Sequence, residues 1–115
     1  MSYTVTDKIT NYSDVKYTSW EDFFENGLYM NKTKSDVYAE QSAQIQEALS
    51  EDDWIKFDDI TKNAVINIDW DIDNQVATRT KTYNSMEDYI FVDYANSHLT
   101  PYERKPEVEW NFIIS

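Results

Sequence analysis

The chain has 115 residues, a length typical of a single domain, and its 22 Asp and Glu residues against ten Lys and Arg residues give a formal net charge of −12. Because 41% of the residues are hydrophobic and 16% are aromatic, a folded core is expected and disorder of the whole chain is not. The lack of cysteine excludes disulfides and thiolate metal sites, and the scarcity of Lys and Arg disfavours direct binding to nucleic acid or to an anionic membrane. We expect one acidic α+β domain spanning residues 1–115, whose natural partner is a basic protein.

The sequence contains no pattern typical of a targeting or membrane-spanning segment. Residues 1–10 have no basic region followed by an apolar run. No stretch approaches the roughly 20 apolar residues that would cross a bilayer. We therefore expect an intracellular, cytoplasmic protein that does not bind membranes.

The first half of the chain is predicted to hold one short strand and two helices. Residues 3–9 alternate loosely and predict the strand. Ser19 followed by Asp22 resembles a capping box and predicts an amphipathic helix that ends near residues 27–30. A second helix is expected over about 33–50. Its predicted buried stripe consists of Val37, Tyr38, Gln41, Ile45, Ala48 and Leu49.

Two segments of the second half fit more than one element. Residues 52–61 have apolar spacing that suits either a helix or a strand, and periodicity cannot decide so short a run. Ser85 with Asp88 repeats the capping signature and predicts a helix to about Ala95, although the apolar run inside it would also suit a strand. The breakers gather in residues 96–106, which predicts the longest irregular connection.

The segment 64–83 is predicted to form a β-hairpin. Its first strand, 64–73, places isoleucines on one face and aspartates on the other, and its second strand, 76–83, is rich in β-branched residues. A three-residue turn would place Arg79 and Lys81 on the aspartate face, and a two-residue turn would place them on the isoleucine face, in conflict with burial. We expect the first register, with the middle of the hairpin partly neutralised and its tip uncompensated.

The last element, residues 107–114, alternates apolar and polar side chains and is expected to pair in the same sheet. The predicted architecture is an α+β fold in which two or three short helices pack on a small, mainly antiparallel sheet. That sheet contains the 64–83 hairpin and the C-terminal strand.

Patterns for catalysis and metal binding are largely missing. His98 is the only histidine, and no nucleophile motif lies near it. The alternate aspartates of 69–73 resemble the opening of an EF-hand calcium loop, but Asn74 stands where that loop needs Gly and Thr80 where it needs Glu. We therefore expect no enzyme activity, no cofactor and no specific metal site.

Clusters of acidic residues carry the clearest functional signal. Alternate residues on one face of a strand lie about 6.6–6.8 Å apart, roughly the spacing of successive phosphates along one DNA strand. The candidate partner-binding residues are Glu21, Asp22, Glu25, Glu51, Asp52, Asp53, Asp58, Asp59, Asp69, Asp71 and Asp73.

These clusters favour a non-enzymatic inhibitor that mimics the DNA phosphate backbone and occupies the basic groove of a nucleic-acid-binding protein. In size, charge and lack of catalytic residues the chain is similar to phage-encoded DNA mimics that block restriction, CRISPR or nucleoid proteins, without a shared motif. The resemblance implies a viral protein that acts in the host cytoplasm. A homodimer would double the acidic surface.

The alternative hypothesis is a structural or adaptor module of a larger assembly, such as a small virion component. Exposed aromatic side chains would favour it, because uncovered apolar patches mark protein interfaces. The candidates are Tyr12, Tyr17, Tyr29, Tyr94 and Tyr102.

Overall fold

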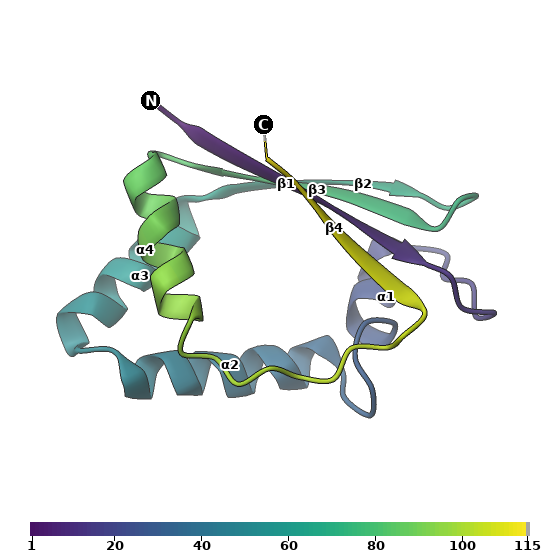
Figure 1. Cartoon of the computed structure of the whole chain (residues 1–115), viewed down its shortest axis with the longest axis horizontal. Coiled ribbons are helices and arrows are strands. Elements are labelled where there is room, and N and C mark those ends of the chain that lie inside the picture. Colours follow the sequence, from purple (N-terminus) through teal and green to yellow (C-terminus); the bar gives the residue numbers. More distant parts are fainter. Residues whose placement is uncertain (115) are drawn as a thin grey trace.

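One layer of antiparallel strands and one layer of helices make up the described part of the chain, as Figure 1 shows. The computed structural model describes the backbone of residues 1–114 and the side chains of residues 1–112. In chain order the elements are β1 (Tyr3–Asn11), α1 (Trp20–Asn26), α2 (Lys34–Ala48), α3 (Glu51–Asn63), β2 (Val65–Asp71), β3 (Val76–Tyr83), α4 (Met86–Asn96) and β4 (Val108–Ile114). The predicted α+β fold is confirmed, with four helices among residues 1–114 where two or three were expected.

Both segments that the sequence left open are helical, and N-caps show why the helices begin where they do. At each start, a hydroxyl accepts a hydrogen bond from the backbone N–H three residues further on, which satisfies one of the free N–H groups of the first turn. The four capping residues are Ser19, Thr33, Ser50 and Ser85. Acidic residues follow these caps because the first turn of a helix favours negative charge.

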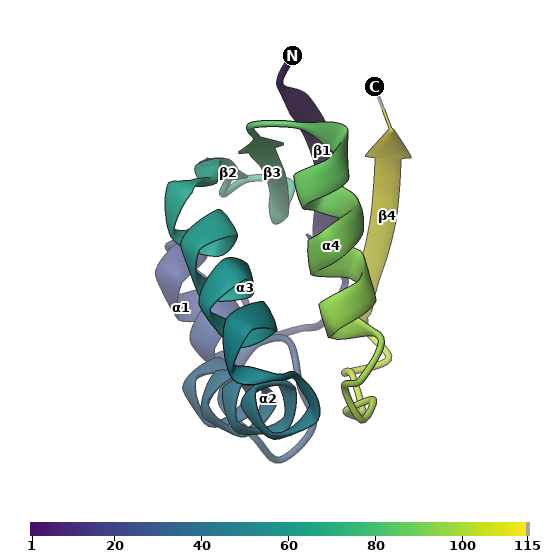
Figure 2. The same ribbon diagram turned by 90° about the vertical axis from the view of Figure 1, so that its left-hand side faces the viewer.

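The strands follow the order β2-β3-β1-β4, and the helices cover one face of the sheet (Figures 1 and 2). The other face is open and rich in threonine. Thr6 lies opposite Thr80, and the hydroxyl oxygens of Thr4 and Thr82 are 3.0 Å apart. The odd-numbered residues of β1 and β3 all point toward the helices, because side chains alternate along a strand and several of these positions are buried.

The apolar core is divided into two clusters. The larger one joins the sheet to α1 and to the start of α2, and its buried members are Ile9, Tyr17, Trp20, Phe23, Leu28, Tyr29, Val37, Ala77 and Val108. The smaller one consists of Ile45, Leu49 and Ala95, packed against Trp54, Phe57 and Leu99. None of the members of the smaller cluster lies on a strand, so helices α2, α3 and α4 pack on one another at that end.

This arrangement overturns two predictions about burial. Tyr38 and Ala48, expected in the buried stripe of α2, are exposed, whereas Lys34 is buried. Ile66 and Ile68 were expected in the core but are 52% and 39% exposed. The isoleucines are exposed because they lie on the edge strand β2, most of which the helices leave uncovered. Lys34 is buried because its ammonium group packs against the rings of Tyr29 and Tyr38.

The register of the hairpin is also different from the expected one. Four residues, 72–75, connect β2 to β3, and Ile68 lies opposite Arg79 while Ile66 lies opposite Lys81. The two cations therefore share the isoleucine face, and the predicted pairing with the aspartate face is wrong. The carboxylate that holds the arginine lies on the neighbouring strand β1, not on β2.

Gln75 anchors the hairpin connection to the loop that follows β1. Its backbone is left-handed, with φ of 57°, and its side chain is buried. The side-chain oxygen accepts hydrogen bonds from Tyr17 N at 2.9 Å and Asn11 Nδ2 at 3.0 Å. The side-chain nitrogen donates to the carbonyls of Tyr17 and Ile72 at 2.9 and 2.8 Å. All four hydrogen-bonding positions of the amide are thus filled.

The substitution Gln75→Ala is expected to lower the free energy of unfolding by about 2–4 kcal/mol, because it leaves buried polar groups without partners. Urea denaturation followed by tryptophan fluorescence measures the change. Gln46→Ala, on an exposed position of α2, serves as the control and should change stability by less than about 0.5 kcal/mol. Similar losses in the two variants would rule out an anchoring role.

Candidate functional site

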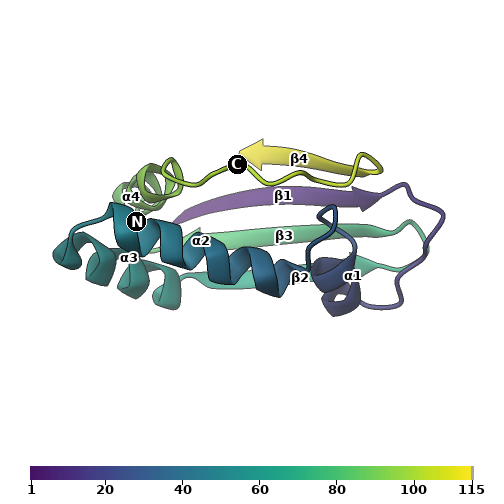
Figure 3. The ribbon, with the colours of Figure 1, turned by 90° about the horizontal axis from the view of Figure 1, so that it is seen from below.

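The eleven candidate acids lie on three elements, α1, α3 and β2 with its turn. Figures 2 and 3 agree that these elements lie along the same long side of the molecule, which we call the acidic side. Eight of the acids are exposed, and Glu25, Asp53 and Asp58 are half-buried. The eleven acids, less Lys56 and Lys62 on α3, give the acidic side a formal charge of −9 out of the total of −12.

On α1, hydrogen bonds orient two of the three acids. Asp22 accepts from Asn26 Nδ2 at 2.9 Å. Glu25 Oε2 accepts from the hydroxyl and the backbone N–H of Ser35 at 2.8 and 3.3 Å, which joins α1 to the first turn of α2. Glu21 is exposed in the first turn, where the helix N-terminus favours its charge.

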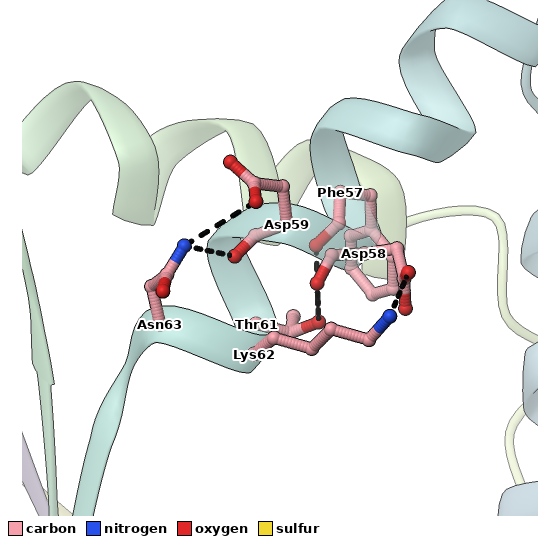
Figure 4. Close-up of polar contacts among 6 residues, drawn as sticks. All are labelled: Phe57, Asp58, Asp59, Thr61, Lys62 and Asn63. Atoms are coloured by element: carbon pink, nitrogen blue, oxygen red, sulfur yellow. Dashed lines mark hydrogen bonds and ion pairs between the residues drawn. The ribbon is translucent and has the colours of Figure 1, made fainter.

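In the second half of α3, the adjacent acids Asp58 and Asp59 have partners four residues further along (Figure 4). Lys62 Nζ lies 2.7 Å from Asp58 Oδ2, and this hydrogen-bonded ion pair raises the pKa of the lysine. Asn63 Nδ2 donates to the carbonyl and the carboxylate of Asp59 at 3.0 and 3.3 Å. Residues 51–53, in the first turn, have no cationic partner among the described ion pairs.

On β2, the regular ladder has two carboxylates and not the predicted three. Asp69 and Asp71 share the open face of the sheet, but Asp73 lies in the turn. Asp71 accepts from the side-chain amide and the backbone N–H of Asn74 at 2.8 and 3.1 Å, and these bonds lower the pKa of its carboxyl. Both ladder residues lie opposite uncharged residues of β3, so the expected neutralisation by the hairpin cations does not occur.

A buried ion pair lies at the centre of the covered face. Asp7 and Arg79 are directly opposite each other on β1 and β3. Nε and Nη2 of Arg79 donate to the two oxygens of Asp7 at 3.1 and 2.7 Å, and the two side chains are only 10% and 8% exposed. Such a fork-shaped contact satisfies both charges, as burial requires. It explains why Arg79 faces the helices.

Other cations gather around this pair. Burial, reinforced by the positive charges of Arg79, Lys81 and Arg104, lowers the pKa of Lys34 to about 8. Burial and Arg79 lower the pKa of Lys81 to about 8, although Asp7 acts in the opposite direction. Four of the ten Lys and Arg residues of this acidic chain thus lie near one another. Lys34 and Arg79 are buried, Lys81 is half-buried and Arg104 is exposed.

The two lysines differ in how they are accommodated. Lys34 Nζ lies 4.0 Å from the ring centroid of Tyr38 and 3.3 Å from the hydroxyl of Tyr29, so aromatic rings and a hydrogen bond compensate its burial. Lys81 has neither an ion-pair nor a hydrogen-bond partner among the residues whose side chains are described. Its charge is therefore the least compensated of the group.

Lys81 lines two adjoining cavities, which together we call the central hollow. The larger has a volume of about 440 Å³ and lies between the sheet and α4. The smaller, of about 280 Å³, lies between the sheet and all of α2, α3 and α4. Both cavities share the walls Lys81, Tyr83, Val92 and Asn96. The central hollow separates the sheet from the smaller apolar cluster.

Sequence reasoning missed the central hollow. One signal was present, since Ala77, Arg79, Lys81 and Tyr83 occupy alternate positions of one strand and must share a face. These cations were instead expected to neutralise the aspartates of β2. Nothing local in the sequence marks Arg104, which lies in the irregular connection before β4.

Few of the aromatic residues considered for an adaptor surface are exposed. Tyr12 and Tyr94 are 65% and 51% exposed. Tyr17 and Tyr29 are buried in the larger apolar cluster, and Tyr102 is half-buried against it, so the expectation of exposure is wrong for these three. The chain therefore has fewer exposed aromatic side chains to form an adaptor surface than the sequence suggested.

Comparisons of the chain with protein-family models, with curated proteins and with solved structures find no match.

Within the described residues, no helix has the length and apolar character needed to cross a membrane. The same part of the chain holds no group of three or more His, Cys, Asp and Glu side chains arranged to bind a metal ion.

Removing one partner of the Asp7–Arg79 ion pair is expected to lower the free energy of unfolding more than replacing both partners with apolar residues. Asp7→Ala should lower the free energy of unfolding by about 3–5 kcal/mol, because Arg79 then stays buried without a counter-charge. The double variant Asp7→Leu and Arg79→Met should cost less than that single change. Chemical denaturation of the two variants measures both losses of stability. A larger loss in the double variant than in Asp7→Ala would contradict the idea that the unpaired charge of Arg79 causes the loss.

The variant Lys81→Met is expected to be more stable than the wild type at pH 7, by about 1–3 kcal/mol, because it removes a half-buried charge that has no partner. The folded protein holds the pKa of Lys81 near 8, below its ordinary value of 10.5. Between pH 8 and pH 10.5, Lys81 is protonated in the unfolded chain but largely neutral in the folded protein. Raising the pH through this range therefore increases the free energy of unfolding of the wild type, and the difference in stability between the wild type and Lys81→Met becomes smaller.

Chemical denaturation at pH 7 and pH 10 measures both effects. Lys8→Met is the matched control, because Lys8 lies on the open face of the same sheet and is exposed. Its effect should stay within about 0.5 kcal/mol. A destabilised Lys81→Met protein would show that Lys81 is a structural support.

Proposed function

We propose that this protein is a non-enzymatic inhibitor that presents its acidic side to the basic groove of a nucleic-acid-binding protein and competes with DNA for that groove. The observation that carries the proposal is the position of all eleven candidate acids on three elements along one long side. In this proposal the protein is phage-encoded and acts in the host cytoplasm on a restriction, CRISPR or nucleoid protein.

The charge of the acidic side exceeds what solubility requires. A small domain is well served by a net charge of magnitude about 2–8, and further charge destabilises the compact state through self-repulsion. The formal charge is −9 on the acidic side alone and −12 over the whole chain. A partner of opposite charge would explain why so large an imbalance is retained.

The length of the molecule supports the same proposal. Its longest dimension is 44 Å. With an axial rise of about 3.4 Å per phosphate, one DNA strand of that length carries roughly 13 phosphates. The eleven carboxylates of the acidic side are similar in number, so the protein can replace most of the charge that one strand would offer to a groove.

The carboxylates are also held in place by the fold. The caps fix the first turns of α1 and α3, and β2 fixes the direction of Asp69 and Asp71. Preorganised charges lose little conformational entropy on binding. Most of these charges remain exposed and available to a partner.

An affinity experiment tests the proposal directly. The immobilised protein is expected to capture a nucleic-acid-binding protein from a bacterial lysate at about 50 mM salt, and duplex DNA should elute it. Because the contacts are charge pairs, recovery should fall at least tenfold when the salt is raised to about 300 mM. Capture of no such protein, or capture that ignores salt and DNA, overturns the proposal.

Charge-neutral variants separate the position of the acids from their number. The triple variant Asp52→Asn, Asp69→Asn and Asp73→Asn should weaken binding of the captured protein at least tenfold, since it removes exposed charges from α3, β2 and the turn. The control triple variant carries Glu47→Gln, Glu87→Gln and Glu107→Gln. It loses the same charge from elsewhere and should bind within about threefold of the wild type. Equal losses in both triple variants would exclude a specific role for the acidic side.

A further inference from the structure

The central hollow is not explained by the proposed inhibitor function. A charge that is withdrawn from water without a partner costs stability. This chain nevertheless keeps the half-buried Lys81 in the shared wall of two adjoining cavities of about 440 and 280 Å³, both of which reach solvent beside exposed lining residues. Cavities that bind small molecules typically measure about 300–1,000 Å³.

The charged groups of the larger cavity leave an excess of positive charge. Asp7 is neutralised by its two hydrogen bonds to Arg79. The other charged lining residues are Lys81, Arg104 and Asp93, two cations against one anion, and both Arg104 and Asp93 are exposed at the edge of the cavity. Lys81 and Arg104 make no ion pair with a carboxylate among the described side chains, so both can bind an anion.

Aromatic rings form a second part of the wall. Tyr83, Tyr89, Trp110 and Phe112 line the larger cavity. The guanidinium carbon of Arg104 lies 4.4 Å from the ring centroid of Trp110, so a cation already stands against one of these rings. Phe112 is 71% exposed although its position in β4 places it opposite Asp7, on the face that the helices cover.

We propose that the central hollow binds a small organic phosphate that carries an aromatic ring, the chemical class to which nucleotides belong. The phosphate binds Lys81 and Arg104, and the ring packs against Tyr89 and Phe112. A phosphate suits this site better than a carboxylate does, because it carries close to two negative charges and three acceptor oxygens and can therefore bind two cations at once.

Binding also resolves the stability problem that Lys81 creates. An unpaired lysine in the wall of a cavity is costly in the free protein, and an anion that binds it supplies the missing counter-charge. Groups that weaken the free fold are typical of binding sites. The same lysine that destabilises the free protein thus becomes a source of affinity for the ligand.

This proposal is independent of the inhibitor function. The cavities are lined by the covered face of the sheet, by α2, α3 and α4 and by the connection before β4, but none of the eleven acids of the acidic side lines either of them. Loss of ligand binding in a hollow variant and loss of partner capture in an acidic-side variant are therefore separate results.

Isothermal titration calorimetry with the four ribonucleoside 5′-monophosphates tests the proposal on the whole chain at pH 7 and low salt. At least one of them is expected to bind with a Kd below about 1 mM. Its nucleoside and ribose 5-phosphate should each bind at least tenfold more weakly, since each lacks one half of the recognised groups. The proposal fails if none of the monophosphates binds, or if either fragment binds as well as the whole nucleotide.

Substitution of the unpaired lysine tests the location of the site. Lys81→Met should weaken the binding of the nucleotide at least tenfold, and Lys8→Met, on the open face of the sheet, should change it by less than about twofold. A thermal unfolding curve for each variant confirms that it is folded. Unchanged affinity in a folded Lys81→Met protein overturns the assignment to the central hollow.

Discussion

The contact between Arg79 and Asp7 constrains more of this structure than any other single interaction. Two buried charges that face each other on β1 and β3 leave those strands little freedom to shift register, since any slip would separate them in a medium of low polarity. Because side chains alternate, Lys81 must then face the helices as well. The isoleucines of β2 lie beside these cations, so the middle of the covered face cannot form an ordinary apolar core, and the helices pack around it.

Charge is therefore distributed in opposite ways on the outside and on the inside. Carboxylates lie on α1, on α3 and on the edge strand of one long side, whereas several of the few cations are drawn into the fold. The strand β2 lies next to both regions, with aspartates on its open face and isoleucines on its covered face. A strongly acidic exterior weakens the approach of an anionic ligand from solution, so such a ligand depends on the cations inside for its affinity.

Much of the fold was predictable from local patterns. The serines at 19 and 85 mark helix starts through side-chain hydrogen bonds that span three residues. Alternation identified the first strand of the hairpin, and β-branched residues identified the second. The register was not predictable, because the residue that decides it, Asp7, lies 72 positions before Arg79. The acids of the candidate site could be named from their clustering, but the central hollow depends on distant segments that only the folded chain brings together.

The division of the apolar core has a consequence for motion. The cluster among α2, α3 and α4 has only three buried members and includes no strand residue, whereas the larger cluster is built directly on the sheet. Regions with few buried contacts open at a lower free energy than the rest of a protein. We expect α3 and α4 to detach together from the sheet while β1, β3 and α1 remain folded. Such local opening would widen a hollow that already reaches solvent beside Phe112.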